Sequence, residues 1–363
     1  MLARYAHLLT HYCLGVKPGD KVFISSTLLA EPLVRAVYRE ALEAGAALVE
    51  TDLAFRERDR TLMNVGSEAA LAMPSPLWQQ AMETFDCYLA IRAPFNLRES
   101  HSTTPERAKM RQDAMAAGQK AYFARTATHE MRRNLCQFPT DASAQEAGMS
   151  LSEYEHFVYS ACKLLEPDPI AAWLQQRATQ QHIVDHLNKC KTVRYLGEGT
   201  DLTFSTAGRT WINSDGQTNM PSGEVYTSPV EDSANGTVHF SFPCIYQGRE
   251  VENVTLWLKE GYVEKWEATR GKDFLDHIFS LPGTRRFGEA AIGTNYGINR
   301  MTKNILFDEK IGGTVHLAIG QSYLQTGGKN ESAVHWDMIT DMTRGGEIWA
   351  DGEKIYENGQ FLI

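Results

Sequence analysis

The chain has 363 residues, 43% of them hydrophobic, so it is long enough to bury a core in each of two domains. Its formal net charge of -9 and the lack of any stripe of Lys and Arg argue against a nucleic-acid partner, because binding phosphates requires concentrated positive charge. No apolar stretch approaches the roughly 20 residues that span a bilayer. Residues 1–20 lack the features of a signal peptide, so we expect a cytoplasmic protein with no membrane partner.

The first half of the chain alternates strand and helix patterns. Residues 21–25, 31–44 and 47–50 read as strand, helix and strand, with Gly45 ending the helix. The same rhythm then predicts a strand, a helix and a strand at residues 85–91, 104–117 and 120–124. This order is typical of an α/β domain with an open, mostly parallel sheet.

Two helical segments follow, and the character of the chain then changes. The helices are expected around residues 151–165 and 171–188. Beyond them, apolar and polar residues alternate between Gly-rich turns, which predicts strands at 202–205, 238–242, 254–258 and 262–266. We therefore expect an α/β domain over residues 1–190 and an α+β, strand-rich catalytic domain over residues 191–363.

Several common catalytic motifs are missing from the sequence. The pairs His7/His11 and His182/His186 have the four-residue spacing of helical zinc ligands, but neither has the Glu of the zinc-protease motif, so we interpret both as chance surface pairs. The six cysteines form no Cys-x-x-Cys pair. No Gly-rich phosphate loop and no Gly-x-Ser-x-Gly motif is present, so the sequence predicts no nucleotide cofactor and no serine nucleophile.

Polar residues in apolar strands are the strongest signal in the second half. Glu224 lies in a bend flanked by Pro and Gly, and Glu289 lies among small and apolar residues. A buried carboxylate requires a cation, which is either a metal ion or a neighbouring Arg285 or Arg286. His316 is likewise embedded in an apolar segment, where a single histidine is more often an ordinary core residue.

A further pair strengthens the case for a metal site. His335 and Asp337 are two residues apart in an apolar segment, so on a strand both side chains point to one face. The full candidate set, called here the five-residue cluster, is Glu224, Glu289, His316, His335 and Asp337. Three carboxylates and two imidazoles suit two divalent ions that share a carboxylate, such as zinc, cobalt or manganese. A metal pair indicates hydrolysis, because it acidifies a bridging water.

At these residues the sequence resembles the M29 family of metallo-aminopeptidases, the aminopeptidase T and aminopeptidase S group. That family has ligands in the order Glu, Glu, His, His and Asp, with a Tyr seven residues after the first His. The matching segments here are 221–227, 288–291, 306–309 with 316–323, and 335–337. The resemblance implies that the five-residue cluster binds the metals, that Glu289 is also the catalytic base, and that Tyr323 stabilises the tetrahedral intermediate. Gly223 departs from the acidic residue common in the family.

The resemblance also implies what the enzyme does. It predicts hydrolysis of the N-terminal residue of short peptides by a homodimer, with the N-terminal domain as a lid and a site of oligomer contacts. Two alternatives remain open. The related dihydroxypyridine ring-cleaving dioxygenases use two His and one carboxylate for a single Fe(II), which His316, His335 and Asp337 would provide, and residues 221–223 and 231–236 resemble that group. The other alternative is a metal-binding protein without catalytic activity.

Overall fold

The computed structural model describes residues 1–99 and 101–363 and divides into two compact units. One comprises residues 1–170 with 216–221, and the other comprises residues 171–215 with 222–363. The division falls near residue 170, whereas the sequence led us to expect it at 190. The difference is helix α9 (Pro169–Leu187), whose side chains Ile183, Val184 and Leu187 are buried in the core of the second unit.

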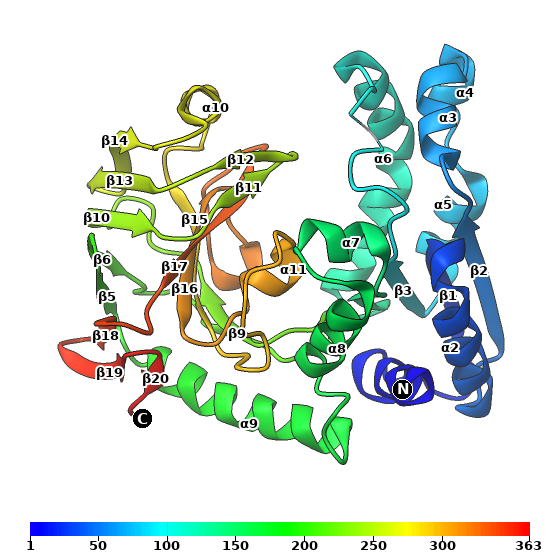
Figure 1. Ribbon diagram of the computed structural model, residues 1–363, viewed down its shortest axis with the longest axis horizontal. Coiled ribbons are helices and arrows are strands. Elements are labelled where there is room, and N and C mark those ends of the chain that lie inside the picture. Colours follow the sequence, from blue (N-terminus) through cyan, green and yellow to red (C-terminus); the bar gives the residue numbers. More distant parts are fainter. Residues whose placement is uncertain (100) are drawn as a thin grey trace. The chain divides into compact units, whose positions relative to one another are not determined.

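A five-stranded parallel sheet forms the centre of the first unit (Figure 1). Its strands, in spatial order, are β2 (Leu48–Ala54), β1 (Lys21–Thr27), β3 (Cys87–Arg92), β4 (Arg132–Gln137) and β8 (Asn219–Met220). Every neighbouring pair is parallel. The expected α/β domain with an open parallel sheet is therefore confirmed.

Helices cover this sheet, and their apolar residues recur at helical spacing. In α2 (Glu31–Glu43), for example, Leu33, Val34, Val37 and Ala41 are buried. Residues of α5 and α6 pack with Phe23 and Tyr88 of the sheet. The helical segments of this unit are α1 (Leu2–His7), the π-helical turn η1 (Leu8–Cys13), η2 (Leu28–Ala30), α2, α3 (Arg58–Val65), α4 (Glu68–Ala72), α5 (Pro76–Thr84), α6 (Pro105–Ala127), α7 (Asp141–Glu146) and α8 (Leu151–Ala161).

One predicted element of the first unit is wrong. Residues 120–124, expected as a strand, lie within the second half of α6, and the strand of this region is β4. Ala121 and Tyr122 pack against the cluster of α5 and sheet residues. Gly118 lies where an added Cβ would meet the Trp78 ring, which brings the two helices close together. A short apolar run fits either a helix or a strand, and here tertiary packing decides for the helix.

The second unit contains two antiparallel sheets and a short hairpin. The larger sheet has eight strands, in the order β14 (Tyr262–Glu267), β13 (Val254–Lys259), β10 (Asn235–Phe240), β6 (Thr200–Ser205), β5 (Thr192–Gly197), β18 (Glu347–Ala350), β19 (Glu353–Glu357) and β20 (Gln360–Phe361). The smaller sheet, called the site sheet below, has the order β17 (His335–Asp341), β16 (Thr314–Gly320), β15 (Phe287–Gly293), β9 (Glu224–Thr227) and β7 (Ile212–Ser214). β11 (Cys244–Tyr246) and β12 (Arg249–Val251) form the hairpin. The strand-rich second domain is confirmed.

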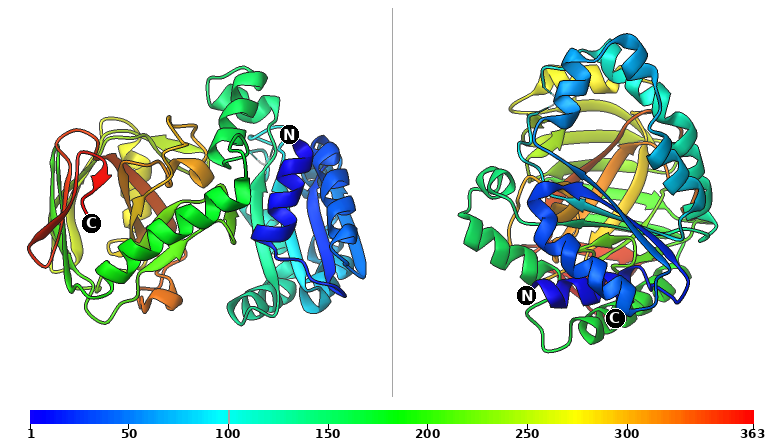
Figure 2. Two further views of the ribbon diagram at one scale, coloured as in Figure 1. Left: turned by 90° about the horizontal axis from the view of Figure 1, so that it is seen from below. Right: turned by 90° about the vertical axis from the view of Figure 1, so that its right-hand side faces the viewer.

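The core of this unit lies between its two sheets (Figures 1 and 2). Buried residues of the large sheet, such as Phe204 and Leu256, belong to the same apolar cluster as Leu317 and Met338 of the site sheet. Each site-sheet strand therefore gives one face to the core, which leaves its other face for polar residues. The remaining helical segments are α9, α10 (Lys272–Phe279), α11 (Ile305–Asp308) and η3 (Leu324–Thr326). Within the part of the chain described, no helix is long and apolar enough to cross a bilayer.

Candidate metal centre

The register of the site sheet brings the five-residue cluster together. Glu224 on β9 lies opposite Gly293 of β15, and Glu289 on β15 lies opposite Ala318 of β16. Asp337 on β17 also pairs with Ala318. Directly opposed residues point to the same face of a sheet, and residues two apart on a strand do so as well.

The two histidines follow the same rule. His316 pairs with Ala291, two residues from Glu289, and His335 pairs with Gly320, two residues from Ala318. All five residues therefore share one face of four adjacent strands. Ala291, Gly293, Ala318 and Gly320 stand opposite members of the cluster on this face, and small residues there leave space beside the carboxylates and imidazoles.

Glu289 is the central member of the cluster. Its Oε1 lies 3.8 Å from Nε2 of His316, and its Oε2 lies 3.1 Å from Nε2 of His335. Glu224 Oε2 is 3.6 Å from His316 Nε2, and Asp337 Oδ1 is 3.4 Å from His335 Nε2. Glu289, His316 and Asp337 each offer one ligand atom, and these three atoms lie within 4.8 Å of one another. In the described residues Glu289 thus pairs with histidines, not with Arg285 or Arg286.

Several polar atoms of the cluster are buried without a hydrogen-bond partner in the described part of the chain. They are Glu224 Oε2, His316 Nδ1 and Asp337 Oδ1. Leaving such atoms unsatisfied costs free energy, and a bound cation would coordinate the two carboxylate oxygens. His335 Nδ1 donates to the backbone oxygen of Gln321 at 2.8 Å, which leaves Nε2 facing the carboxylates. This is the arrangement that orients metal-binding histidines. The residues present therefore fit a metal centre.

The shifted pKa values of the cluster show that its buried carboxylates favour positive charge beside them. Burial lowers the pKa of His316, but Glu289 and Glu224 outweigh this effect and raise it to about 9. Burial raises the pKa of Asp337, yet His335 and His316 bring it down to about 2. The protons on both imidazoles thus offset part of the carboxylate charge. Metal ions would take the place of these protons, because histidine binds metals in its neutral form.

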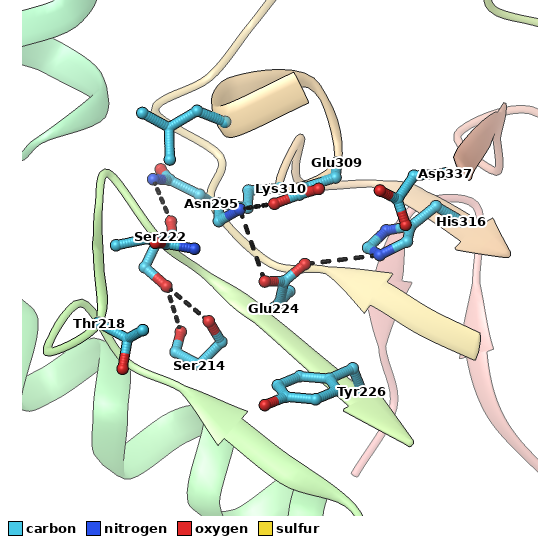
Figure 3. A network of polar contacts seen from close by, with 12 residues as sticks. Ser214, Thr218, Ser222, Glu224, Tyr226, Asn295, Glu309, Lys310, His316 and Asp337 are labelled. Carbon is cyan, nitrogen blue, oxygen red and sulfur yellow. Dashed lines mark hydrogen bonds and ion pairs between the residues drawn. The ribbon is translucent and has the colours of Figure 1, made fainter. Parts of the chain in front are cut away.

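Two charged residues beside the cluster were missed by the sequence analysis as members of the site. Lys310 is fully buried, and its Nζ lies 3.6 Å from Glu224 Oε1 and forms a closer ion pair with Glu309 (Figure 3). Burial raises the pKa of Glu309 to about 8, and the carboxylates raise that of Lys310 to about 12 against the effect of burial. Their signal in the sequence is a run of three charged residues, Asp308, Glu309 and Lys310, between the apolar residues Phe307 and Ile311.

Tyr323 lies at the more accessible side of the cluster. Its hydroxyl is 3.4 Å from His335 Nε2, and the residue is 39% exposed. Its ring makes an edge contact with Tyr226 on β9, with ring centroids 5.5 Å apart. Gln325 donates a hydrogen bond to the Tyr226 hydroxyl. Burial and the nearby carboxylates raise the pKa of Tyr323, so its hydroxyl keeps its proton and can donate.

A cluster of carboxylates and imidazoles without cysteine is typical of a metal-dependent hydrolase. Comparison with known proteins identifies the family: the one described as thermophilic metalloprotease (M29) matches residues 1–361. The chain therefore belongs to the M29 family of metallopeptidases.

The relatives agree with this assignment. Aminopeptidase 2 of Geobacillus stearothermophilus is 28% identical over an alignment covering 100% of this chain and 98% of that protein. Aminopeptidase T of Thermus thermophilus is 25% identical, covering 99% and 95% of the two chains. The solved structure of AmpT from Thermus thermophilus matches 100% of this chain and 99% of its own, with a TM-score of 0.86 at 23% identity, which shows the same fold.

These findings decide between the functional classes left open by the sequence. The expected family is confirmed, and so is the enzyme class, a metallo-aminopeptidase that hydrolyses peptide bonds. The ring-cleaving dioxygenase has no support, because the matched family and relatives are peptidases. Membership of an enzyme family also argues against a purely structural metal-binding protein.

Proposed function

We propose that the chain removes the N-terminal residue of short peptides, using two divalent metal ions held by the five-residue cluster. The observation that carries this proposal is the position of Glu289, which turns one carboxylate oxygen toward each histidine. Glu224 lies beside His316, and Asp337 lies beside His335. The cluster thus offers one carboxylate and one imidazole on each side of a shared carboxylate.

The donor set fits zinc, cobalt or manganese, which accept both nitrogen and carboxylate ligands. When bound, such a pair of ions acidifies water, polarises the scissile carbonyl and can accept the free amine of the substrate. The protein holds the donors in place from adjacent strands and buries most of them. His335 is the most exposed member of the described cluster, and Tyr323 lies beside it on the exposed side.

Glu289 and Tyr323 have separate catalytic roles in this proposal. Glu289 would help to hold the ions and would also accept the proton of the attacking water and pass it to the leaving amine. Tyr323 donates a hydrogen bond to the oxygen on which negative charge develops. The contact with Tyr226 restricts the Tyr323 ring, so that the hydroxyl remains near His335.

The Tyr323→Phe variant should lose a large part of its activity. Removing the hydroxyl removes a donor used in the transition state, so we expect kcat to fall roughly 10²- to 10³-fold with little change in KM. Steady-state kinetics on an amino-acid p-nitroanilide measures both quantities. Tyr262→Phe makes the same change at an exposed residue of the large sheet and should leave kcat unaltered. Equal kcat values for wild type and Tyr323→Phe would contradict the role of Tyr323.

The two-metal proposal is tested by metal content and by substrate choice. Elemental analysis should find two more ions per chain in the wild type than in the His316→Ala/His335→Ala variant, and a difference of one would contradict a metal pair. Subtracting the variant removes ions bound elsewhere. Peptides with a free amino terminus should be cleaved, and the same peptides with an acetylated terminus should not. Equal cleavage of both would rule out an aminopeptidase. From the family resemblance we also propose a cytoplasmic homodimer.

A further inference from the structure

A second group of metal-ligating side chains lies in the first unit, outside the candidate metal centre. It consists of His7 at the end of α1, His11 in the π-helical turn η1, and Glu40 in α2. His7 Nδ1 lies 2.7 Å from Glu40 Oε1, and His11 Nε2 lies 3.0 Å from the same oxygen. Two imidazoles and one carboxylate from separate helices thus converge on one point.

The backbone explains how the two imidazoles meet. His7 and His11 are four residues apart, so they lie on the same side of the helical segment. Their ring centroids are 4.4 Å apart. The chain between them passes from α-helical to π-helical winding, with the amide of Leu14 bonded to the oxygen of Leu9. Local π-helical turns of this kind occur frequently at functional sites.

The donor atoms fit a divalent ion of the borderline class. One atom from each of the three residues lies within 4.8 Å of the others, and two imidazole nitrogens with one carboxylate oxygen suit zinc and similar ions. The side chains of His7, His11 and Glu40 are 55%, 37% and 20% exposed, so an ion can reach them and water can complete its coordination. In the described residues, Glu40 forms no ion pair with a Lys or Arg.

The other histidine pair with this spacing lacks the third donor. His182 and His186 are four residues apart on α9, but among the described residues no carboxylate is paired with both of them. His186 Nε2 lies 3.9 Å from Glu353, and His182 forms no ion pair in the residues that the structure describes. The pair therefore provides a matched control with the same residue types and the same spacing on a helical segment.

We propose that His7, His11 and Glu40 form a binding site for one borderline divalent ion, such as Zn²⁺, separate from the catalytic centre. The ion links the N-terminal helical segment to α2. Because it binds the folded arrangement and not the unfolded chain, it stabilises the first unit by an amount that grows with the logarithm of the free metal concentration. From the sequence alone we interpreted His7 and His11 as a chance surface pair. The proposed site adds a third ligand, Glu40, which lies on α2 and is distant from both histidines in the sequence.

Zinc content of the whole chain tests the site. Wild type, His7→Ala/His11→Ala and the control His182→Ala/His186→Ala are loaded with Zn²⁺, dialysed at a fixed free concentration and analysed for metal. The first variant should hold one zinc per chain fewer than wild type, while the control equals wild type. All three should keep the same peptidase activity. Equal zinc content in the three proteins would overturn the proposal.

A second measurement gives the same answer without relying on removal of the imidazoles. Glu40→Gln keeps the size of the side chain but weakens the third ligand, so it should lower zinc affinity at this site about tenfold or more. Added Zn²⁺ should raise the melting temperature of chelator-treated wild type more than that of Glu40→Gln. An equal shift in both proteins would show that zinc acts only elsewhere, which contradicts the site.

Discussion

Replacing Glu289 by Gln should reduce kcat for peptide hydrolysis roughly 10²- to 10⁴-fold, the range supplied by a positioned general base. The amide has the same size as the carboxylate but cannot accept the proton of the attacking water. Glu289 is 4% exposed and lies beside Ala318, so an isosteric residue fits the same space. The amide can still hydrogen-bond to His316 and His335, and we expect the variant to remain folded. Steady-state kinetics with saturating metal measures the effect.

Two comparisons make this result specific. Glu264→Gln makes the same change on an exposed position of β14 and should keep full activity. A thermal melt of Glu289→Gln separates loss of the base from loss of the fold. Near-normal peptidase activity in a folded Glu289→Gln protein would sink the assignment of Glu289 as the base.

Replacing Lys310 by Met should destabilise the metal-free protein by about 3–5 kcal/mol, because removal of one partner leaves a buried charge uncompensated. Lys310 is fully buried between Glu309 and Glu224. With metal bound, the added positive charge replaces part of the missing ammonium, and the loss should be smaller. Urea unfolding with metal and with chelator measures both values. In the Lys310→Met variant, Glu309 loses the basic residue with which it forms an ion pair in the described chain.

A double variant provides the matched control for Lys310. Lys310→Met combined with Glu309→Gln removes both charges of the closer pair, and it should recover much of the stability lost in the single variant. A single variant within about 0.5 kcal/mol of wild type, a typical surface effect, would contradict the structural role of Lys310. So would a double variant that is less stable than the single one.

The sequence led us to propose the five-residue cluster, because polar residues stand out in apolar strands, and the structure places these residues on one face of the site sheet. The i and i+2 spacing of His335 and Asp337 also predicted a shared face, as observed. The register between strands could not be predicted, since it depends on pairing of distant segments. Lys310 and Glu309 were missed for the same reason. Nothing local shows that the residues after α11 lie against Glu224.

The first unit shows where local patterns are ambiguous. Residues 120–124 contain an apolar run that fits a strand, and only the packing of Tyr122 with the α5 cluster identifies it as helix. The four-residue spacing of His7 and His11 was visible in the sequence, but two surface histidines can also have this spacing by chance. Glu40 distinguishes the two interpretations, and its approach depends on how α1 packs against α2.

The distribution of the five-residue cluster over four strands links the centre to the way the second unit folds. Glu224 and Asp337 stand at opposite edges of the group β9, β15, β16 and β17, and the paired strands β9 and β15 are far apart along the chain. Pairings of this kind form late, because long loops must close first. As they close, four carboxylates, including Glu309, approach one another. Where metal is scarce, only Lys310 and the protons on His316 and His335 offset this negative charge as the sheet closes, so we expect metal supply during synthesis to affect the yield of folded enzyme.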